Sequence, residues 1–252
     1  MLETQDLTIR FGGHVAVDHV TCGFEPGTLT SIVGPNGAGK TTYFNLISGQ
    51  LQPSAGRVLL AGEDITALPA PLRTRKGIGR AFQLTQLFPR LSVQENVRLA
   101  VQARHRGGLD LLRVWLDRRD WIDEAVAILE QVQLGDKLDV LAAALPHGDQ
   151  RKLEVAMLMA LDPTVYMFDE PTAGMSGDDV PVVLDLIRAL KQRSDRVILL
   201  VEHKMDVVRE LSDRIVVLHN GRLVADGEPA VVIASPAVQN AYLGIGVEEE
   251  AA

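Results

Sequence analysis

Residues 34–41 read GPNGAGKT, and this stretch decides how the rest of the chain is interpreted. It fits the pattern G-x-x-x-x-G-K-[ST], in which glycines let backbone N–H groups curl around a phosphate. The apolar segment TLTSIV (28–33) before it reads as a short strand, and the helical pattern KTTYFNLISG begins at its end. A helix that begins near Gly39 would direct its positive end at the anion. The stretch therefore predicts a phosphate-binding loop between a strand and a helix.

Two residues of this loop carry most of the expected chemistry. Lys40 would reach the β- and γ-phosphates of a nucleotide, and the Thr41 hydroxyl would bind Mg²⁺. Because its charge would neutralise the charge that develops during phosphoryl transfer, Lys40 is a candidate catalytic residue as well as a ligand. The residues expected to contact the nucleotide here are Gly34, Pro35, Asn36, Gly37, Ala38, Gly39, Lys40, Thr41 and Thr42.

A second signal is the segment VYMFDEP (165–171), which reads as a buried strand ending in two acids. Asp169 would hold Mg²⁺ through water, and Glu170 would polarise an attacking water molecule. Adjacent acids at a strand end are also common in proteins without this chemistry. The phosphate loop earlier in the chain is what favours the functional interpretation.

Two further polar residues stand at predicted strand ends. Gln83 follows the strand IGRAF (78–82), and His203 ends the apolar run RVILLVEH. Open α/β sheets place ligand-binding groups at the carboxyl ends of their strands. A single histidine is more often structural, but at this position we expect both side chains to belong to the site.

The remaining pattern indicates an α/β fold with an N-terminal antiparallel β subdomain, which a hairpin signal at Gly12-Gly13 begins. Helical periodicity from residue 92 predicts an inserted α-helical subdomain over 93–155, with a mobile middle. Strands then alternate with helices, as in a parallel sheet, and end in a hairpin at Asn220-Gly221. We therefore predict a core of 1–92 and 156–235, the insertion, and a C-terminal tail of 236–252 with a disordered acidic end.

Composition excludes several classes of protein. The chain has 252 residues, a formal net charge of −8 and one cysteine, Cys22. No apolar segment approaches the roughly 18 residues of a membrane span, and the polar start MLETQDLTIR is unlike a secretory signal. A lone cysteine suits a reducing compartment, and the acidic balance argues against nucleic-acid binding. These features predict a cytoplasmic protein that binds no nucleic acid.

Taken in order, these features resemble the nucleotide-binding subunits of ATP-binding-cassette (ABC) transporters. The resemblance runs from about residue 2 to about residue 243 and includes the stretch LPHGDQRKLE (145–154). It implies a P-loop NTPase (RecA-like) core with ATP and Mg²⁺ as cofactors. In such a site Glu170 is the catalytic base, His203 steadies the γ-phosphate, and Gln83 contacts Mg²⁺ and the attacking water. Phe11 would stack on adenine, although an ordinary hydrophobic strand end would look the same.

The stretch 145–154 departs from the family pattern. There a helix N-terminus with the sequence Leu-Ser-Gly-Gly-Gln caps the γ-phosphate held by a second subunit, so that two head-to-tail chains sandwich two ATP molecules. Here proline replaces the serine and its hydroxyl, aspartate adds a negative charge near the helix start, and Ser176 replaces an aspartate that contacts the partner. We expect a weaker sandwich that rests on backbone N–H groups and a histidine, with a purely structural helix start as the alternative. The corresponding residues are Leu145, Pro146, His147, Gly148, Asp149 and Gln150.

Two segments, GIGRAFQLTQLFPRLSVQENV (77–97) and NAYLG (240–244), resemble the ATP-binding subunits of branched-chain amino-acid importers of the LivG type. Subunits of urea and short-amide importers and the lipopolysaccharide-export ATPase are similar, and they remain alternatives. The resemblance implies integral membrane permease subunits, a second ATP-binding subunit (this chain again or a related sister chain) and, indirectly, a periplasmic or extracellular substrate-binding protein. It places the chain on the inner face of the cell membrane. Apolar residues after the glutamine would receive a short permease helix or else belong to the core: Leu84, Leu87 and Phe88.

Two rival functions belong to other classes. A soluble cassette ATPase acting on ribosomes or DNA usually has two cassettes or a very long insertion, whereas this chain has one phosphate loop, a modest insertion and an acidic charge. A regulator that binds nucleotide without hydrolysing it would suit the unusual residues Pro146 and Ser176. The presence of every expected hydrolytic residue favours a working ATPase over both.

Overall fold

The N-terminal residues form a four-stranded antiparallel sheet in the computed structural model, which describes residues 1–81, 87–105 and 119–243. Its strand order is β2 (His14–Phe24), β1 (Leu2–Phe11), β4 (Ala55–Leu60) and β5 (Glu63–Asp64). The hairpin predicted at Gly12-Gly13 joins β1 to β2, with Phe11 opposite His14. The predicted antiparallel β subdomain is therefore confirmed.

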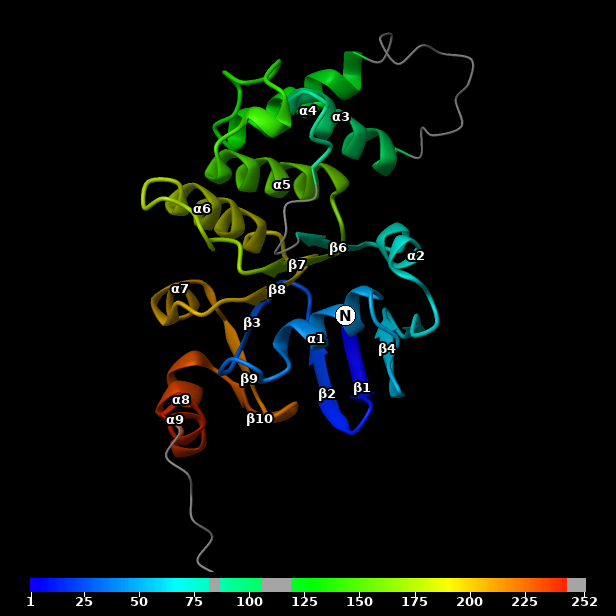
Figure 1. The fold of residues 1–252 in the computed structure, drawn as a ribbon, viewed down its shortest axis with the longest axis vertical. Helices are drawn as coiled ribbons and strands as arrows, with labels where there is room; N and C mark the ends of the chain where they lie inside the picture. Colours follow the sequence, from blue (N-terminus) through cyan, green and yellow to red (C-terminus); the bar gives the residue numbers. More distant parts are fainter. Residues whose placement is uncertain (82–86, 106–118, 244–252) are drawn as a thin grey trace, which may run out of the picture.

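A six-stranded sheet forms the centre of the molecule (Figure 1). Its order is β10 (Arg222–Gly227), β9 (Arg214–His219), β3 (Leu29–Val33), β8 (Val197–Val201), β7 (Val165–Asp169) and β6 (Ile78–Ala81). Neighbouring strands from β9 to β6 run parallel, and β10 returns antiparallel through the predicted turn at Asn220-Gly221. The carboxyl ends of β3, β7 and β8 therefore meet at one edge of the sheet, which is where the predicted site residues follow them.

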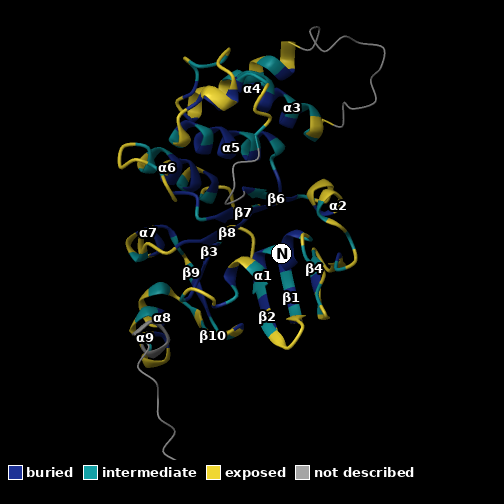
Figure 2. Cartoon of the chain, in the orientation of Figure 1, coloured by how far each residue is buried: buried dark blue, intermediate teal, exposed yellow. Residues whose placement is uncertain are grey.

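The central strands are buried on both faces, as Figure 2 shows. Side chains of β7 alternate between two cores: Tyr166 and Phe168 pack on one side, and Val165 and Met167 on the other. This two-residue period is expected of a strand covered on both faces, and it explains why the segment is a continuous apolar run.

Different elements cover the two faces. Helix α1 (Lys40–Ser48) and the antiparallel sheet share one core with the central strands. Helices α5 (His147–Leu161), α6 (Val180–Lys191) and α7 (Met205–Leu211) contribute to the core on the opposite face. Other helices lie at the periphery: α2 (Ala70–Arg75), α8 (Pro229–Ala234) and α9 (Pro236–Leu243).

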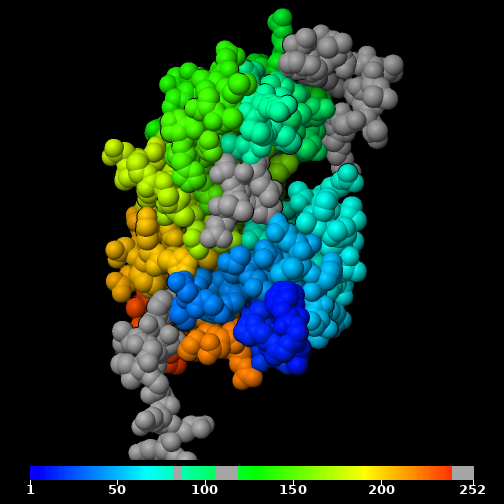
Figure 3. Space-filling view, viewed as in Figure 1, coloured from blue at the N-terminus to red at the C-terminus, as the bar shows by residue number. Residues whose placement is uncertain are grey.

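The predicted insertion is helical and forms a lobe at one end of the molecule, green in the space-filling view of Figure 3. Helices α3 (Val93–Arg104) and α4 (Arg119–Gln131) pack against each other and against α5. The Ser92 hydroxyl caps α3 by accepting a hydrogen bond from the Glu95 amide. A short 3₁₀ helix, Ala142–Ala144, leads into α5, which continues through the predicted boundary at residue 155 to Leu161. The middle that was expected to be mobile and the acidic end of the tail lie outside the described residues.

Candidate nucleotide-binding site

The phosphate loop joins β3 directly to α1, as predicted. Gly39 is the N-cap of α1 and has a φ of 98°, a left-handed conformation that favours glycine. A Cβ at Gly39 would also collide with the carbonyl oxygen of Ala16, and a Cβ at Gly34 would collide with that of Leu218. The loop therefore needs glycine at both positions, because it passes so close to neighbouring backbone.

Lys40 folds back over its own loop. Its side chain is buried, and Nζ donates hydrogen bonds to the carbonyl oxygens of Gly34 (2.7 Å) and Pro35 (3.0 Å). Burial lowers the pKa of Lys40, and the nearby carboxylates of Glu170 and Asp169 oppose that shift. The hydrogen-bond partners of the ammonium are thus neutral carbonyls, so a phosphate oxygen would supply the negative charge that they lack.

The two acids after β7 occupy different environments. Asp169 is completely buried, and its Oδ2 accepts a hydrogen bond from Arg80 Nη2 at 2.6 Å. Its other oxygen, Oδ1, is buried without a hydrogen-bond partner among the described residues. Glu170 has a φ of 51°, which is uncommon outside glycine and typical of residues whose conformation a functional site imposes.

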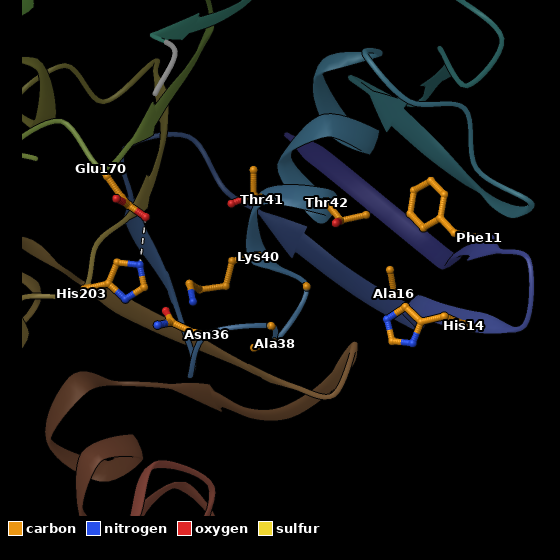
Figure 4. A pocket seen from close by; sticks show the side chains of 12 residues that line it. Phe11, His14, Ala16, Asn36, Ala38, Lys40, Thr41, Thr42, Glu170 and His203 are labelled. Carbon is orange, nitrogen blue, oxygen red and sulfur yellow. Dashed lines mark hydrogen bonds and ion pairs between the residues drawn. The ribbon is translucent and has the colours of Figure 1, made fainter. Parts of the chain in front are cut away.

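Glu170 and His203 contact each other beside the phosphate loop (Figure 4). His203 Nε2 lies 2.9 Å from Glu170 Oε1. The conformation of Glu170 is fixed by its backbone, since its amide donates to the Val201 carbonyl and its own carbonyl accepts from Arg151 Nη2. The carboxylate is partly exposed and can therefore meet a water molecule as well as the imidazole.

These residues line one pocket of about 410 Å³. In Figure 4 Glu170 and His203 lie at one end, Phe11 and His14 lie at the other, and Lys40 lies between them. Half of the Phe11 surface is exposed, so its ring is free to stack on a flat ligand. The lining residues are Phe11, His14, Ala16, Asn36, Gly37, Ala38, Gly39, Lys40, Thr41, Thr42, Glu170 and His203.

The structure thus brings most of the predicted residues together. Gly34, Pro35 and Asp169 adjoin the pocket through the contacts above, whereas Gln83 and Leu84 lie outside the described residues. Sequence reasoning missed His14 and Ala16, which follow the glycine pair of the predicted hairpin and line the pocket beside Phe11. It also missed Arg80, whose only sequence signal is a charge within the predicted strand 78–82.

The stretch 145–150 lies at the N-terminus of α5 and does not line this pocket. Pro146 is the N-cap of the helix, as expected, and makes no side-chain capping bond. Gln150 closes the turn, because its Nε2 donates to the Leu145 carbonyl at 3.0 Å. His147 is exposed at the first turn, where its ring lies close to Gly174.

Asp149 lies in the first turn of α5, as expected, and its negative charge is paired there. Its carboxylate is buried and accepts from Lys137 Nζ (2.6 Å) and Lys152 Nζ (3.3 Å). Lys152 also pairs with Asp179 at 2.5 Å, and Asp179 accepts a hydrogen bond from the Ser176 hydroxyl. The aspartate is therefore part of a balanced network and leaves no isolated charge facing a phosphate.

The network around Asp149 and Asp179 explains why residue 148 is a glycine. A Cβ at this position would lie 2.5 Å from Oδ2 of Asp179. The carboxylate reaches over the first turn of α5 from the start of α6. Any larger residue at position 148 would push it away, which ties the helix start to the loop that follows Glu170.

Comparison with known proteins identifies the family. Residues 17–173 match the protein family described as ABC transporter. The chain is 38% identical over 250 residues to the high-affinity branched-chain amino acid transport ATP-binding protein BraF of Pseudomonas aeruginosa (97% of this chain and 98% of that protein). It is 37% identical over 249 residues to the protein of the same description, LivG, of Escherichia coli K12, with the same coverage of both chains.

Solved structures agree with this assignment. A nucleotide-free ATP-binding cassette from an ABC transporter superposes with a TM-score of 0.81 and 28% identity, over 96% of this chain and 98% of that one. Another cassette, in its ADP conformation, has a TM-score of 0.80 and 28% identity, over 97% and 98%. No helix among the described residues is long and apolar enough to cross a membrane. The chain belongs to the ABC transporter family, and within it to the ATP-binding cassettes with a P-loop NTPase core, which bind and hydrolyse ATP.

Proposed function

We propose that this chain binds Mg²⁺-ATP in the pocket behind the phosphate loop and hydrolyses it to drive import of branched-chain amino acids. The observation that carries the site is the contact of Glu170 with His203 at the phosphate end of that pocket. The observation that carries the substrate class is the similarity to BraF and LivG over nearly the full length of both chains.

Nucleotide binding follows from the shape and charge of the pocket. The loop amides and the N-terminus of α1 offer hydrogen-bond donors to the phosphates, and Lys40 exchanges its carbonyl partners for phosphate oxygens. At the other end of the pocket Phe11 takes the adenine ring on its exposed face.

The described residues suit Mg²⁺, which prefers oxygen ligands and keeps several of its own waters. Asp169 has a buried carboxylate oxygen without a hydrogen-bond partner among the described residues, and the Thr41 hydroxyl lines the pocket. We therefore assign these two residues, with Gln83, to the metal. Bound there, Mg²⁺ would neutralise charge on the transferred phosphate. Among the described residues no group of three or more His, Cys, Asp or Glu side chains could hold a metal ion by itself, and in this proposal the ATP phosphates supply further oxygen ligands.

Hydrolysis then depends on Glu170 and His203. The Glu170 carboxylate takes a proton from the water that attacks the γ-phosphate, and the bond between the β–γ bridging oxygen and that phosphorus breaks. His203 contacts the carboxylate through Oε1, lines the same pocket, and would steady the γ-phosphate. Lys40 stabilises the charge that develops on the transferred group.

The partners follow from the same proposal. The N-terminus of α5, with residues Leu145–Gln150, would close on the ATP held by a second ATP-binding subunit. Integral permease subunits would bind the apolar residues near Phe88, whose side chain is about half exposed. A substrate-binding protein would deliver the amino acid from the other side of the membrane, so the chain would act as a peripheral protein on the inner face.

Assays of ATP hydrolysis and of substrate uptake test the two halves of this proposal. With its permease subunits in vesicles, the chain should hydrolyse ATP and accumulate leucine, isoleucine and valine, and urea or short amides should not compete. Glu170→Gln should abolish both activities while ATP still binds, whereas Lys40→Ala should weaken ATP binding itself. Glu63→Gln is the matched control, because that glutamate is exposed and lies outside the pocket. ATP binding without turnover in the wild-type complex would reduce the protein to a nucleotide-binding regulator, and competition by urea would overturn the substrate class.

A further inference from the structure

Arg80 joins three elements around the candidate metal site. It lies on β6, next to β7 in the sheet, and its side chain is 5% exposed. Its Nη2 donates to Asp169 Oδ2 at the end of β7. Its Nη1 donates to Asn45 Oδ1 (2.7 Å) and to Ser48 Oγ (3.0 Å), which both belong to α1.

Three acceptors engage the two terminal nitrogens of this guanidinium. Ser48 donates its own hydroxyl hydrogen to the Phe44 carbonyl, so its oxygen is left to accept from Arg80. The guanidinium carbon also lies 5.5 Å from the centre of the Phe44 ring, within the range of a cation–π contact. A lysine has one nitrogen and could not reach Asp169 and α1 at the same time, whereas the planar fork of arginine can.

This arrangement decides which oxygen of Asp169 remains for a ligand. Oδ2 is committed to Arg80, and a charge-assisted bond of 2.6 Å fixes the rotation of the carboxylate. Oδ1 is left buried without a hydrogen-bond partner among the described residues. Buried acceptors are nearly always satisfied in the working state of a protein, so this oxygen is the one that a metal-bound water would use.

The same contacts set the distance between α1 and the end of β7. Thr41 lies in the first turn of α1, and Asn45 lies one turn further along the same helix. By holding Asn45 and Asp169 together, Arg80 fixes the spacing between the hydroxyl and the carboxylate that we assign to the metal.

We infer that Arg80 is a positioning residue for the metal: it orients Asp169 and holds it at a fixed spacing from α1, so that Mg²⁺ binds the nucleotide complex tightly. This inference rests on the proposed binding of Mg²⁺-nucleotide in the pocket. Residues that orient metal ligands from behind typically contribute about 10- to 100-fold in metal affinity.

Metal titrations of the full chain with bound ADP test this inference without relying on activity. Mn²⁺ serves as the probe, because its free form gives an electron paramagnetic resonance signal. Arg80→Lys should weaken Mn²⁺ binding to the ADP complex by about 10- to 100-fold. The affinity for ADP in the presence of EDTA should stay unchanged, since Arg80 does not line the pocket.

Arg73→Lys is the matched control. Arg73 is also buried and also bonds to α1, through the carbonyls of Leu46 and Ile47, but it has no contact with Asp169. Arg73→Lys should lower the unfolding temperature and leave Mn²⁺ affinity unchanged. Equal losses of Mn²⁺ affinity in the two variants would show general loosening of α1 and would overturn the inference.

A third variant decides the matter if Arg80→Lys does not fold. Asn45→Ala removes one contact to α1 and keeps the Arg80–Asp169 pair, so it should weaken Mn²⁺ binding in the same direction but less. An unchanged Mn²⁺ affinity in both the Arg80 and the Asn45 variants would overturn the positioning role of Arg80 and leave the proposed function intact. A wild-type chain that binds no ADP would instead overturn the proposed function on which it rests.

Discussion

Cys22 shows how strongly the fold changes the chemistry of a single residue. The thiol is buried, and burial raises its pKa to about 12, although the Arg214 guanidinium nearby acts in the opposite direction. At pH 8 roughly one thiol in ten thousand is then ionised. Since the thiolate is the reactive form, we expect a disulfide reagent such as DTNB to leave the native protein unlabelled.

Labelling in denaturant provides the comparison for this prediction. The unfolded chain should react with one equivalent, because Cys22 is its single cysteine, and Cys22→Ser should not react at all. Rapid labelling of the native protein would contradict the burial of this strand. A labelling rate that rises with mild denaturant would report the opening of the sheet around β2.

At the scale of the residue, the sequence is most informative where a function demands a fixed spacing. Lys40, Glu170 and His203 could be named in advance, because each follows a predicted strand and the fold brings the strand ends together. The environment of Asp149 could not be predicted from the sequence. Its partner Lys137 lies twelve residues earlier in a loop, and Asp179 reaches the network from another helix. Such a pairing depends on packing between segments, and no local pattern encodes it.

The start of α5 is an element in which the sequence departs from the pattern of the family that it resembles. Pro146 gives the helix no side-chain cap. Pro146→Ser would add a hydroxyl that can accept from an amide of the first turn, which typically stabilises a protein by about 1 kcal/mol relative to alanine. We expect the serine variant to unfold at higher urea concentration than Pro146→Ala.

The same pair of variants tests the missing hydroxyl in ATP-driven pairing of two cassettes. If the serine contacts the γ-phosphate held by a partner subunit, Pro146→Ser should pair at lower ATP concentration than Pro146→Ala. Because both variants remove the proline, a difference between them reports the hydroxyl alone. Identical pairing would show that backbone N–H groups suffice.

Arg73 holds the C-terminal end of α1. It has no acidic partner at hydrogen-bond distance among the described residues. Arg73 is fully buried, and the negative end of the helix dipole favours its charge. Arg73→Met should destabilise the fold by about 3 kcal/mol, because it leaves several buried carbonyls unsatisfied. Urea unfolding would measure this, and a stability equal to wild type would contradict it. The guanidinium donates to the carbonyls of Leu46, Ile47, Thr66 and Leu68.

Elements with a long or regular pattern were predictable, and those held by tertiary contacts were not. The strands β3, β7 and β8 can be recognised in the sequence as apolar runs, because strands covered on both faces are predominantly apolar. Helix α2 has six residues and no clear period, and its Arg73 anchors it to α1. Helix α9 begins at Pro236, within the segment predicted as a tail, where Val238 packs into a small core with β9 and α8. Its stability depends on that core, which the helix sequence alone does not reveal.

At the scale of the whole molecule, the separation of α5 from the pocket bears on the proposed pairing of two chains. The residues 145–150 do not line the pocket, and the N-terminus of a helix favours an anion. A head-to-tail pair of chains would place each α5 over the ATP of the other and give a closed twofold arrangement.

Glu170→Gln, which slows hydrolysis, should therefore double in molar mass by light scattering when ATP is added. Lys40→Ala combined with Glu170→Gln is the control and should stay monomeric, because it lacks the phosphate ligand. A monomer that persists with ATP bound would instead point to a sister chain or to the membrane subunits as the missing half, and adding each to the same sample would show which one restores the pair.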